Sequence, residues 1–228
     1  MEYGIIESLK NLKDCILSVI YSGNENCILC NNELYSDKYI CDYCMKSIMI
    51  CRDKTEIGNV NGTLKFDCYS GAYYSGSMME LIVKLKYKSS FRSGHVIADY
   101  MYNSIKANKL EFDFITYVPM TKKDFKRRGF NQGEYLANIL KEYTKKPVIS
   151  CLSKIKSTKD QIGLSKRERW ENIKGSFRFK NISLIKNKNV LIVDDVLTTG
   201  ATAFYCALEL KNNGANKITI LTGAKSRV

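Results

Sequence analysis

The chain contains little proline, tryptophan or histidine, and it has no long run of apolar residues. Its 228 residues include two prolines, one tryptophan, Trp170, and one histidine, His95. So few prolines exclude a proline-rich linker, and the sequence shows neither an internal repeat nor a low-complexity tract. We interpret Trp170 as a packing residue and His95 as a structural histidine on a helix, rather than as catalytic groups.

The apolar stretches are too short for a membrane-spanning helix, and the N-terminus lacks the pattern of a secretory signal. Residues 1–22 place apolar side chains at helical spacing with charges between them, which predicts a short amphipathic helix. This pattern favours docking on the protein's own core over membrane binding. These features predict a cytoplasmic protein with no membrane span.

Two common nucleotide-binding motifs are also absent. The sequence has no GxxxxGK[ST] segment, and it has no GxGxxG segment after a strand. We therefore exclude a P-loop site for nucleoside triphosphates and a dinucleotide site of the Rossmann type.

Acidic residues are outnumbered by basic ones. Lysine and arginine total 36 against 23 aspartates and glutamates, which gives a formal net charge of +13. A positive field of this size attracts phosphates, nucleic acid or anionic membrane surfaces, although scattered lysines are typical of a solvated surface. Two basic clusters are denser than the rest, one at residues 122–128 and the other at residues 154–180.

Nine cysteines are present, and four of them have the spacing of a metal site. Cys27-x2-Cys30 is followed by Cys41-x2-Cys44. Two residues between cysteines allow both thiolates to bind one ion, so two such pairs predict a closed, structural zinc site. Two redox-active CxxC pairs are the alternative, which we disfavour because so short a segment needs metal to fold. Cys51 competes as a ligand with a less suitable spacing, and we interpret the other cysteines as buried thiols.

From about residue 65 onward, helical and strand patterns alternate, which indicates an α/β domain. Expected helices have apolar faces within residues 78–85, 96–101, 135–140 and 203–210. Expected strands cover residues 114–118, 148–152, 190–193 and 218–221. The strand at 190–193 is wholly apolar, as is typical of a central parallel strand.

The segment that begins with this strand carries the strongest functional signal. It reads Val190-Leu-Ile-Val-Asp194-Asp195-Val-Leu-Thr198-Thr199-Gly200-Ala201-Thr202. Ligand sites of α/β proteins lie at the carboxyl ends of parallel strands, and a glycine-containing loop before a helix allows backbone amides to hold a phosphate. Two carboxylates beside a phosphate site fit a ligand that also carries hydroxyls or magnesium, as a phosphorylated ribose does. An Asp-rich turn with a threonine cap is the structural alternative, and the apolar strand before the acids makes it the weaker interpretation.

This segment resembles the phosphoribosyl pyrophosphate (PRPP) motif of type I phosphoribosyltransferases. Further segments narrow the resemblance to the ComF family of competence-related, phosphoribosyltransferase-like proteins: the two CxxC pairs, Val118-Pro119, Arg128-Gly129-Phe130-Asn131-Gln132, and Thr158-x2-Gln161 followed by Glu168-Arg169-x2-Asn172. The resemblance implies an α/β fold, a type I phosphoribosyltransferase-like parallel sheet flanked by helices, with a small N-terminal four-cysteine zinc finger. The expected organisation is an amphipathic helix at residues 1–22, the zinc finger at 23–58 and the phosphoribosyltransferase-like domain at 59–228.

The resemblance also implies roles for particular residues. The two acids contact the ribose hydroxyls, residues 198–202 bind the 5-phosphate, the segment after Val118-Pro119 binds pyrophosphate, and a mobile loop closes over the site. An early helix supplies a lysine near the site. The implied site residues are Asp194, Asp195, Thr198, Thr199, Gly200, Ala201 and Thr202 for the ribose phosphate, Lys86, Arg127, Arg128, Asn131 and Gln132 for pyrophosphate, and Thr158, Gln161, Arg169 and Asn172 in the mobile loop.

Three functions are consistent with these observations. The first is an enzyme that binds Mg-PRPP and lets a nitrogen nucleophile displace pyrophosphate. The second is a non-catalytic PRPP sensor or scaffold in DNA uptake, because no acceptor-base pocket is recognisable. The third is a zinc-ribbon protein that binds DNA, and the basic residues 122–132 suit single-stranded DNA as well as pyrophosphate. Implied cofactors are structural zinc and magnesium with PRPP, and implied partners are a phosphoribosyl ligand, single-stranded DNA and a competence helicase.

Overall fold

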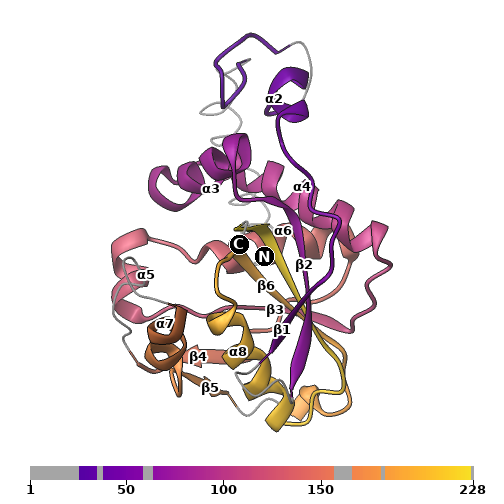
Figure 1. Ribbon diagram of the computed structural model, residues 1–228, viewed down its shortest axis with the longest axis vertical. Coiled ribbons are helices and arrows are strands. Elements are labelled where there is room, and N and C mark those ends of the chain that lie inside the picture. Colours follow the sequence, from indigo (N-terminus) through magenta and orange to yellow (C-terminus); the bar gives the residue numbers. More distant parts are fainter. Residues whose placement is uncertain (1–25, 35–37, 59–63, 157–165, 181–182, 227–228) are drawn as a thin grey trace, which may run out of the picture.

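We describe a computed structural model of the chain, covering residues 26–34, 38–58, 64–156, 166–180 and 183–226 (Figure 1). The amphipathic helix expected at residues 1–22 lies outside this part of the chain. The elements in chain order are α2 (Asp42–Lys46), β1 (Thr55–Gly58), β2 (Lys65–Tyr73), α3 (Gly76–Lys88), α4 (Phe91–Ala107), β3 (Phe114–Tyr117), α5 (Lys122–Arg128), α6 (Gln132–Thr144), β4 (Leu152–Lys154), α7 (Lys166–Ile173), β5 (Phe177–Phe179), the 3₁₀ turn η1 (Ser183–Ile185), β6 (Val190–Leu197), α8 (Ala201–Asn212) and β7 (Ile218–Lys225).

A five-stranded sheet in the order β1-β2-β7-β6-β3 forms the centre of the molecule (Figure 1). β2, β7, β6 and β3 are parallel, and β1 is an antiparallel edge strand on β2. The parallel strands end at Tyr73, Lys225, Leu197 and Tyr117, so these residues lie along one edge of the sheet. The expected α/β fold with a parallel sheet is confirmed.

Helices cover both faces of the sheet because its strands are apolar on both sides. α3, α4 and α6 pack on one face, and α8 packs on the other with α7 and the small β4–β5 sheet (Figure 1). The apolar face predicted within residues 78–85 is fully buried in α3, at Met78, Leu81, Ile82 and Leu85.

β6 is longer than the strand that the sequence predicts. It runs to Leu197 instead of ending at Val193, because β7 continues to pair with it up to Lys225. The two acids expected after the strand therefore lie inside it, and their backbone is fixed by the ladder with β7.

The strand expected at residues 148–152 does not form as such. Val148 makes one parallel bridge to Ile115 of β3. The chain then leaves β3, because the Cys151 amide donates to the Ile149 carbonyl (3.0 Å) and to Thr116 Oγ1 (3.5 Å) instead of to a backbone carbonyl of β3. The strand that follows is β4, which pairs with β5 in a separate two-stranded sheet.

The cysteine-containing segment is joined to the sheet rather than separate from it. Ile50 forms an antiparallel bridge with Ala72 of β2, and β1 continues along the same edge. β1 lies within the range 23–58 that was expected for the zinc finger, and it pairs with β2 as the edge strand of the sheet. Four buried side chains of the finger also belong to the same hydrophobic cluster as α3, α4 and α6: Cys27, Ile40, Cys44 and Ile48.

Candidate functional site

The acid pair lies inside β6 at the point where β3 ends. β6 pairs with β3 only up to Val193, opposite Tyr117, whereas it pairs with β7 as far as Leu197. Among the described residues, the side of β6 that faces away from β7 therefore has no strand partner next to Asp194 and Asp195. Asp195 is 7% exposed, and Asp194 is partly buried. The pair occupies the carboxyl edge of a parallel sheet, where ligand sites of such sheets are found.

A lysine from α3 balances one of the two carboxylates. Lys86 Nζ lies 2.9 Å from Asp195 Oδ2, and both side chains are largely buried. Burial alone would lower the pKa of Lys86, but the attraction of Asp195 outweighs it and raises that pKa above its usual value. Loss of either partner would leave a buried charge without compensation, which is strongly destabilising.

Asp194 is in a less favourable position for a negative charge. Burial and the neighbouring Asp195 carboxylate raise the pKa of Asp194 to about 7, although Lys86 and Lys154 oppose this shift. Asp194 Oδ1 accepts a hydrogen bond from the Asp195 amide at 2.9 Å. Two adjacent carboxylates under this repulsion are suited to share a cation or to accept hydrogen bonds from hydroxyls.

The loop after β6 is supported by β1. Gly200 has a φ of 78°, a left-handed conformation that favours glycine, and it is the N-cap residue of α8. A Cβ atom at this position would lie 2.7 Å from Ile57 Cγ2 of β1. Thr199 Oγ1 accepts from the Ala201 amide at 3.5 Å. The close approach of β1 fixes the loop with the N-terminus of α8 at the carboxyl edge of the sheet, a geometry suited to a phosphate.

The predicted pyrophosphate segment forms a short helix rather than an open loop. α5 begins after Thr121, whose Oγ1 accepts a hydrogen bond from the Asp124 amide at 3.1 Å. It ends at Gly129, which has a φ of 80°. Arg127 pairs with Asp124 at 3.0 Å. The basic residues of this segment are therefore presented by a capped helical turn.

Arg128 and Gln132 form a linked pair beside α3. Arg128 Nη1 donates to Gln132 Oε1 at 3.0 Å, and the Arg128 guanidinium lies 5.9 Å from the centre of the Tyr87 ring. Gln132 is 2% exposed, and its Nε2 has no hydrogen-bond partner among the described residues. A buried N–H group without a partner is costly, and an oxygen atom of a ligand would satisfy it.

Asn131, which was predicted to contact pyrophosphate, makes structural contacts. Its Oδ1 accepts from the Glu134 amide at 3.2 Å, which caps α6, and its Nδ2 donates to Val118 O at 3.0 Å. A contact with pyrophosphate would therefore require Asn131 to exchange partners.

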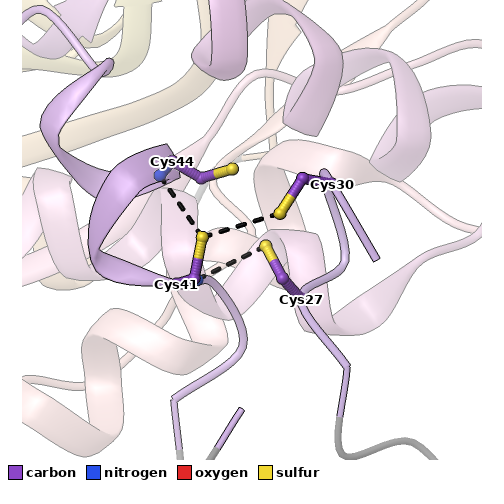
Figure 2. A group of neighbouring side chains, drawn as sticks. All are labelled: Cys27, Cys30, Cys41 and Cys44. Atoms are coloured by element: carbon purple, nitrogen blue, oxygen red, sulfur yellow. Dashed lines mark hydrogen bonds between the residues drawn. The ribbon is translucent and has the colours of Figure 1, made fainter. Parts of the chain in front are cut away.

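The four cysteines of the predicted zinc site converge (Figure 2). The sulfur atoms of Cys27, Cys30, Cys41 and Cys44 all lie within 4.8 Å of one another. The backbone amides of Cys41 and Cys44 donate to sulfur atoms at 3.3 and 3.5 Å. These four side chains could hold a zinc ion. Cys51 lies outside the group, and its thiol donates to a backbone carbonyl two residues further on.

The electrostatics of this cluster fit a cation. Burial acts to raise the pKa of Cys27, but hydrogen bonds from the backbone amides of Cys30, Cys41 and Leu29 outweigh it and lower that pKa to about 6. Burial and the neighbouring sulfur atoms raise the pKa of Cys44. The thiols therefore resist ionising together, whereas one divalent cation would stabilise them all as thiolates.

Comparison with known proteins shows which domain and which relatives this chain resembles. The sequence profile of the phosphoribosyl transferase domain matches residues 126–226. Competence protein F of Haemophilus influenzae is 28% identical over 158 residues, which cover 65% of this chain and 68% of that protein. The DNA utilization protein YhgH of Escherichia coli K12 is 34% identical over 109 residues, or 47% of either chain. The chain is therefore similar to proteins named for competence and for DNA utilization, and its C-terminal half matches a phosphoribosyl transferase domain. It spans about half the length of the YhgH relatives that it matches.

Two solved structures are less similar to this chain. Glutamine PRPP amidotransferase from B. subtilis is 20% identical and covers 57% of this chain and 25% of its own, with a TM-score of 0.38. Adenine phosphoribosyltransferase from Thermoanaerobacter pseudethanolicus is 12% identical and covers 76% of this chain and 95% of its own, with a TM-score of 0.40. Likenesses this remote carry no information about ligands.

The mobile loop expected from the sequence is described only in part. Thr158 and Gln161 lie outside the described residues, as does the side chain of Arg169. Asn172 lies in α7 and is partly buried. The structure therefore leaves the predicted roles of these four residues as predictions.

The single tryptophan and the single histidine have structural positions, as the sequence predicted. The Trp170 ring lies 5.1 Å from the Phe204 ring and 5.8 Å from the Tyr205 ring, so α7 packs on α8. The His95 ring lies between two tyrosine rings at 5.7 and 6.2 Å, and burial lowers the pKa of His95.

Lys154 is a basic residue of the site that the site prediction missed. It is the last residue of β4, and burial lowers its pKa, while Asp124 and Asp194 are the nearest charges that act in the opposite direction. Lys154 therefore adds a second buried lysine to the surroundings of the acid pair. Its position at the start of the second basic cluster was the available signal, but the sequence alone does not place β4 next to β6.

A concave part of the surface lies away from the carboxyl edge. This cavity of about 500 Å³ is at the opposite edge of the sheet, where Asp113 and Asn189 precede β3 and β6. Its lining contains two carboxylates, Glu111 and Asp113, but it has no glycine loop at a helix N-terminus to hold a phosphate. The described residues contain no helix long and apolar enough to span a membrane.

Proposed function

We propose that this protein binds PRPP, or a related ribose 5-phosphate ligand, with magnesium at the carboxyl edge of β6. The observation that carries the proposal is the acid pair inside β6, which lies beyond the last residue that pairs with β3 and is adjacent to Lys86 and the Gly200 loop. A ligand that carries both hydroxyls and phosphate groups requires carboxylates, amides and cations around one space.

The ribose and its 5-phosphate are assigned to β6 and the loop that follows it. Asp194 and Asp195 would accept hydrogen bonds from the 2- and 3-hydroxyls. The amides and hydroxyls of residues 198–202, at the N-terminus of α8, would hold the 5-phosphate. Because the backbone of both acids is fixed by β7 and the loop is fixed by Ile57, this part of the site is preorganised.

The pyrophosphate is assigned to the basic side of the site. In the free protein, Lys86 is paired with Asp195. A ligand hydroxyl or a magnesium ion bound to Asp195 would release the ammonium group of Lys86, which could then contact a phosphate oxygen. Arg128 and the unpaired Nε2 of Gln132 would contact the same group. Magnesium, when bound, would neutralise pyrophosphate oxygens beside the acid pair.

Catalysis would be displacement of pyrophosphate from the anomeric carbon by a nitrogen nucleophile. The C1–O bond to pyrophosphate breaks, a C1–N bond forms, and the pyrophosphate leaves as an anion that the basic side of the site stabilises. A non-catalytic PRPP sensor or scaffold is the other form of the proposal. Release of pyrophosphate from PRPP, measured with each candidate base and ammonia, distinguishes the two forms.

Calorimetry tests the binding proposal. Wild type should bind Mg-PRPP, and Asp195→Ala should abolish binding. Asp113→Ala is the control, because it removes a carboxylate that accepts a hydrogen bond from the Asn189 amide (2.7 Å) at the opposite edge of the sheet. Equal affinity of wild type and Asp195→Ala for Mg-PRPP, or no binding by wild type, would overturn the proposal. Parallel titrations with ribose 5-phosphate and nucleoside monophosphates identify which part of the ligand is recognised.

A role in DNA uptake is a second candidate function, carried by the surface of α5. Lys122, Lys123 and Lys126 are exposed, and Phe125 on the same helix is 47% exposed. Exposed cations with an aromatic ring suit the backbone and bases of single-stranded DNA. We propose that the protein acts in the cytoplasm in DNA uptake and natural transformation, with single-stranded DNA and a competence helicase as partners. DNA binding that falls with salt, and that Lys122→Gln/Lys126→Gln weakens without affecting PRPP binding, supports this role.

A further inference from the structure

The zinc finger is attached to α3 through Lys84. Lys84 Nζ donates a hydrogen bond to Ile28 O, and it also lies 2.9 Å from Glu80 Oε1. Ile28 is inside the first CxxC pair, between Cys27 and Cys30. The direction of its carbonyl is therefore set by the turn that brings both cysteine sulfurs into the metal-binding group.

The same turn of α3 carries Lys86, the lysine that forms an ion pair with Asp195. Lys86 follows Lys84 by two positions, and residues two apart in an α-helix point to nearly opposite sides. Lys84 accordingly reaches the finger, and Lys86 reaches Asp195 at 2.9 Å. In Figure 1, α3 lies between the segment containing α2 and the sheet.

The end of α3 depends on Lys84 as well. The backbone carbonyl of Lys84 accepts hydrogen bonds from two amides. One is that of Ser89, the C-cap residue with a φ of 48°, and the other is that of Ser90 at 3.2 Å. The last turns of helices fray readily, because their carbonyls lack partners within the helix. Lys84 thus anchors this turn by its side chain to the finger and by its backbone to the cap.

The finger also holds the beginning of α3. Ser47, which follows α2, shares a hydrogen bond of 2.6 Å with Ser77 in the first turn of α3. Cys27 and Cys44 belong to the hydrophobic cluster that includes Leu81 and Leu85. Both ends of the helix and its buried face therefore contact the finger.

From these contacts we infer that the zinc finger positions Lys86 at the acid pair, and that Lys84 is the positioning residue through which it acts. With the four sulfurs held by one metal ion, the Ile28 carbonyl stays in place, and α3 keeps its last turn and the Lys86–Asp195 pair. The metal thus acts on the ligand site through Lys84, from outside that site. The inference rests on the proposed function only where ligand binding is measured.

The experiment compares zinc-loaded wild type, Lys84→Met and Lys84→Arg. Methionine keeps the length of the side chain but removes the donor, and arginine restores a donor. Tyr100→Phe is the matched control, because the Tyr100 hydroxyl also bonds the finger, at Met45 O (3.4 Å), but from α4. Circular dichroism and zinc content establish that each variant is folded and loaded.

Two readouts need no ligand. Amide hydrogen exchange in residues 84–88 should be roughly tenfold or more faster in Lys84→Met than in wild type. The NMR signal of the Lys86 side chain, assigned with Lys86→Arg, should move toward that of an exposed lysine. Lys84→Arg and Tyr100→Phe should resemble wild type in both measurements. Unchanged exchange and an unchanged Lys86 signal in Lys84→Met would overturn the inference, as would an equal effect of Tyr100→Phe.

Ligand affinity is the third readout. Lys84→Met should bind Mg-PRPP roughly tenfold or more weakly than wild type, a loss typical of residues that orient a binding group, and Lys84→Arg should recover affinity. If wild type binds no PRPP, the proposed function fails, while the exchange and NMR measurements still decide the role of Lys84. If PRPP binds equally to all variants although the Lys86 signal moves, the inference fails and the proposed function stands.

Discussion

At the scale of single residues, the charge of each group in the candidate site depends on its neighbours. Lys86 neutralises Asp195 directly, whereas Asp194 is next to the same carboxylate and is partly buried. One proton on Asp194 therefore relieves the repulsion in the free protein. A ligand that brings magnesium or hydroxyl donors would replace that proton, which makes binding and protonation compete at this residue.

The first prediction concerns the pH dependence that Asp194 confers. Folding raises its pKa from 3.8 to about 7, so the folded state holds this proton more firmly than the unfolded state. The bound proton on Asp194 stabilises the folded state fully below about pH 4, and this stabilisation is lost as the pH rises to 7. Asp194→Asn should flatten this part of the pH profile and raise Tm at pH 8 by a few degrees, about 2–4 °C per kcal/mol.

Thermal unfolding between pH 4 and pH 8 measures this effect. Asp113→Asn is the control, because it removes a carboxylate at the opposite edge of the sheet. Parallel pH profiles of wild type and Asp194→Asn would contradict the raised pKa.

The second prediction separates two reasons for glycine at position 200. Gly200 and Gly129 have almost the same backbone conformation, with φ of 78° and 80°, but a Cβ at Gly129 meets nothing within 4 Å. Gly129→Ala should therefore lower the free energy of unfolding by about 1–2 kcal/mol, which is the cost of placing alanine in the left-handed conformation. Gly200→Ala should cost more, because its Cβ would also meet Ile57 at 2.7 Å.

Urea unfolding of both variants gives the comparison. Equal losses of unfolding free energy would mean that the support of the loop by β1 is unimportant. A larger loss in Gly200→Ala, accompanied by weaker Mg-PRPP binding, would link the packing of β1 to the proposed phosphate loop.

Single residues also show what the sequence can and cannot reveal about a site. The acid pair, the glycine and the four cysteines are recognisable because each group is contiguous or has a fixed spacing. The packing that unites Lys86, Lys154 and Gln132 around the acid pair is not recognisable, because α3, β4 and α6 meet β6 only after folding. The unpaired Nε2 of Gln132 likewise depends on burial, which no local pattern records.

At the scale of elements, helix caps decide the use of several polar residues. Thr121 and Asn131 were both in a segment predicted to bind pyrophosphate, yet they begin α5 and α6. Asparagine and threonine are favoured N-cap residues, so the sequence contained this signal beside the functional one. The contacts of Asn131 are inside the protein, which favours stabilisation over ligand binding as its main role.

The third prediction tests this role of Asn131. Asn131→Ala should lower the free energy of unfolding by about 1–2 kcal/mol, because α6 loses its cap. Asn131→Asp should cost less, since it keeps an acceptor for the Glu134 amide and loses only the donor to Val118 O. Chemical denaturation without ligand is the measurement. Full stability of Asn131→Ala together with weakened PRPP binding would reassign the residue to the ligand.

Strand lengths show a second limit at this scale. The apolar run of β6 ends at Val193, and its continuation through the acids is imposed by β7, a partner that comes later in the chain. Similarly, the residues around Val148 have strand propensity, but the Cys151 amide bonds the Ile149 carbonyl and the Thr116 hydroxyl instead of continuing the ladder with β3. Local composition predicts that strands exist, and tertiary pairing decides where they end.

At the scale of the whole molecule, the finger and the sheet domain share one interior. Residues of the finger, α3, α4, α6 and the sheet form a continuous hydrophobic cluster. The sequence predicts the two parts from different patterns, and a cysteine spacing says nothing about what the finger packs against. We therefore expect metal binding to stabilise the sheet domain as well as the finger.

The fourth prediction follows from this shared interior. Removing zinc with a chelator should lower the Tm of the whole protein in one cooperative transition, because the loss of the finger uncovers the apolar face of α3. Cys30→Ser should reproduce the effect, since Cys30 is exposed and its loss removes a ligand without creating a cavity. Cys51→Ser is the control: it alters a buried cysteine outside the metal group, so zinc content should be retained even if Tm falls.

Scanning calorimetry with zinc analysis provides the measurement, and readdition of zinc should restore Tm after chelation. A separate low-temperature transition for the finger, with the main transition unchanged, would show two independent units. Coupled unfolding would instead mean that zinc stabilises the framework that holds Lys86 and Asp195 together, because α3 connects the metal-binding turn to that ion pair. The metal would then be structural in its chemistry and still act on the ligand site.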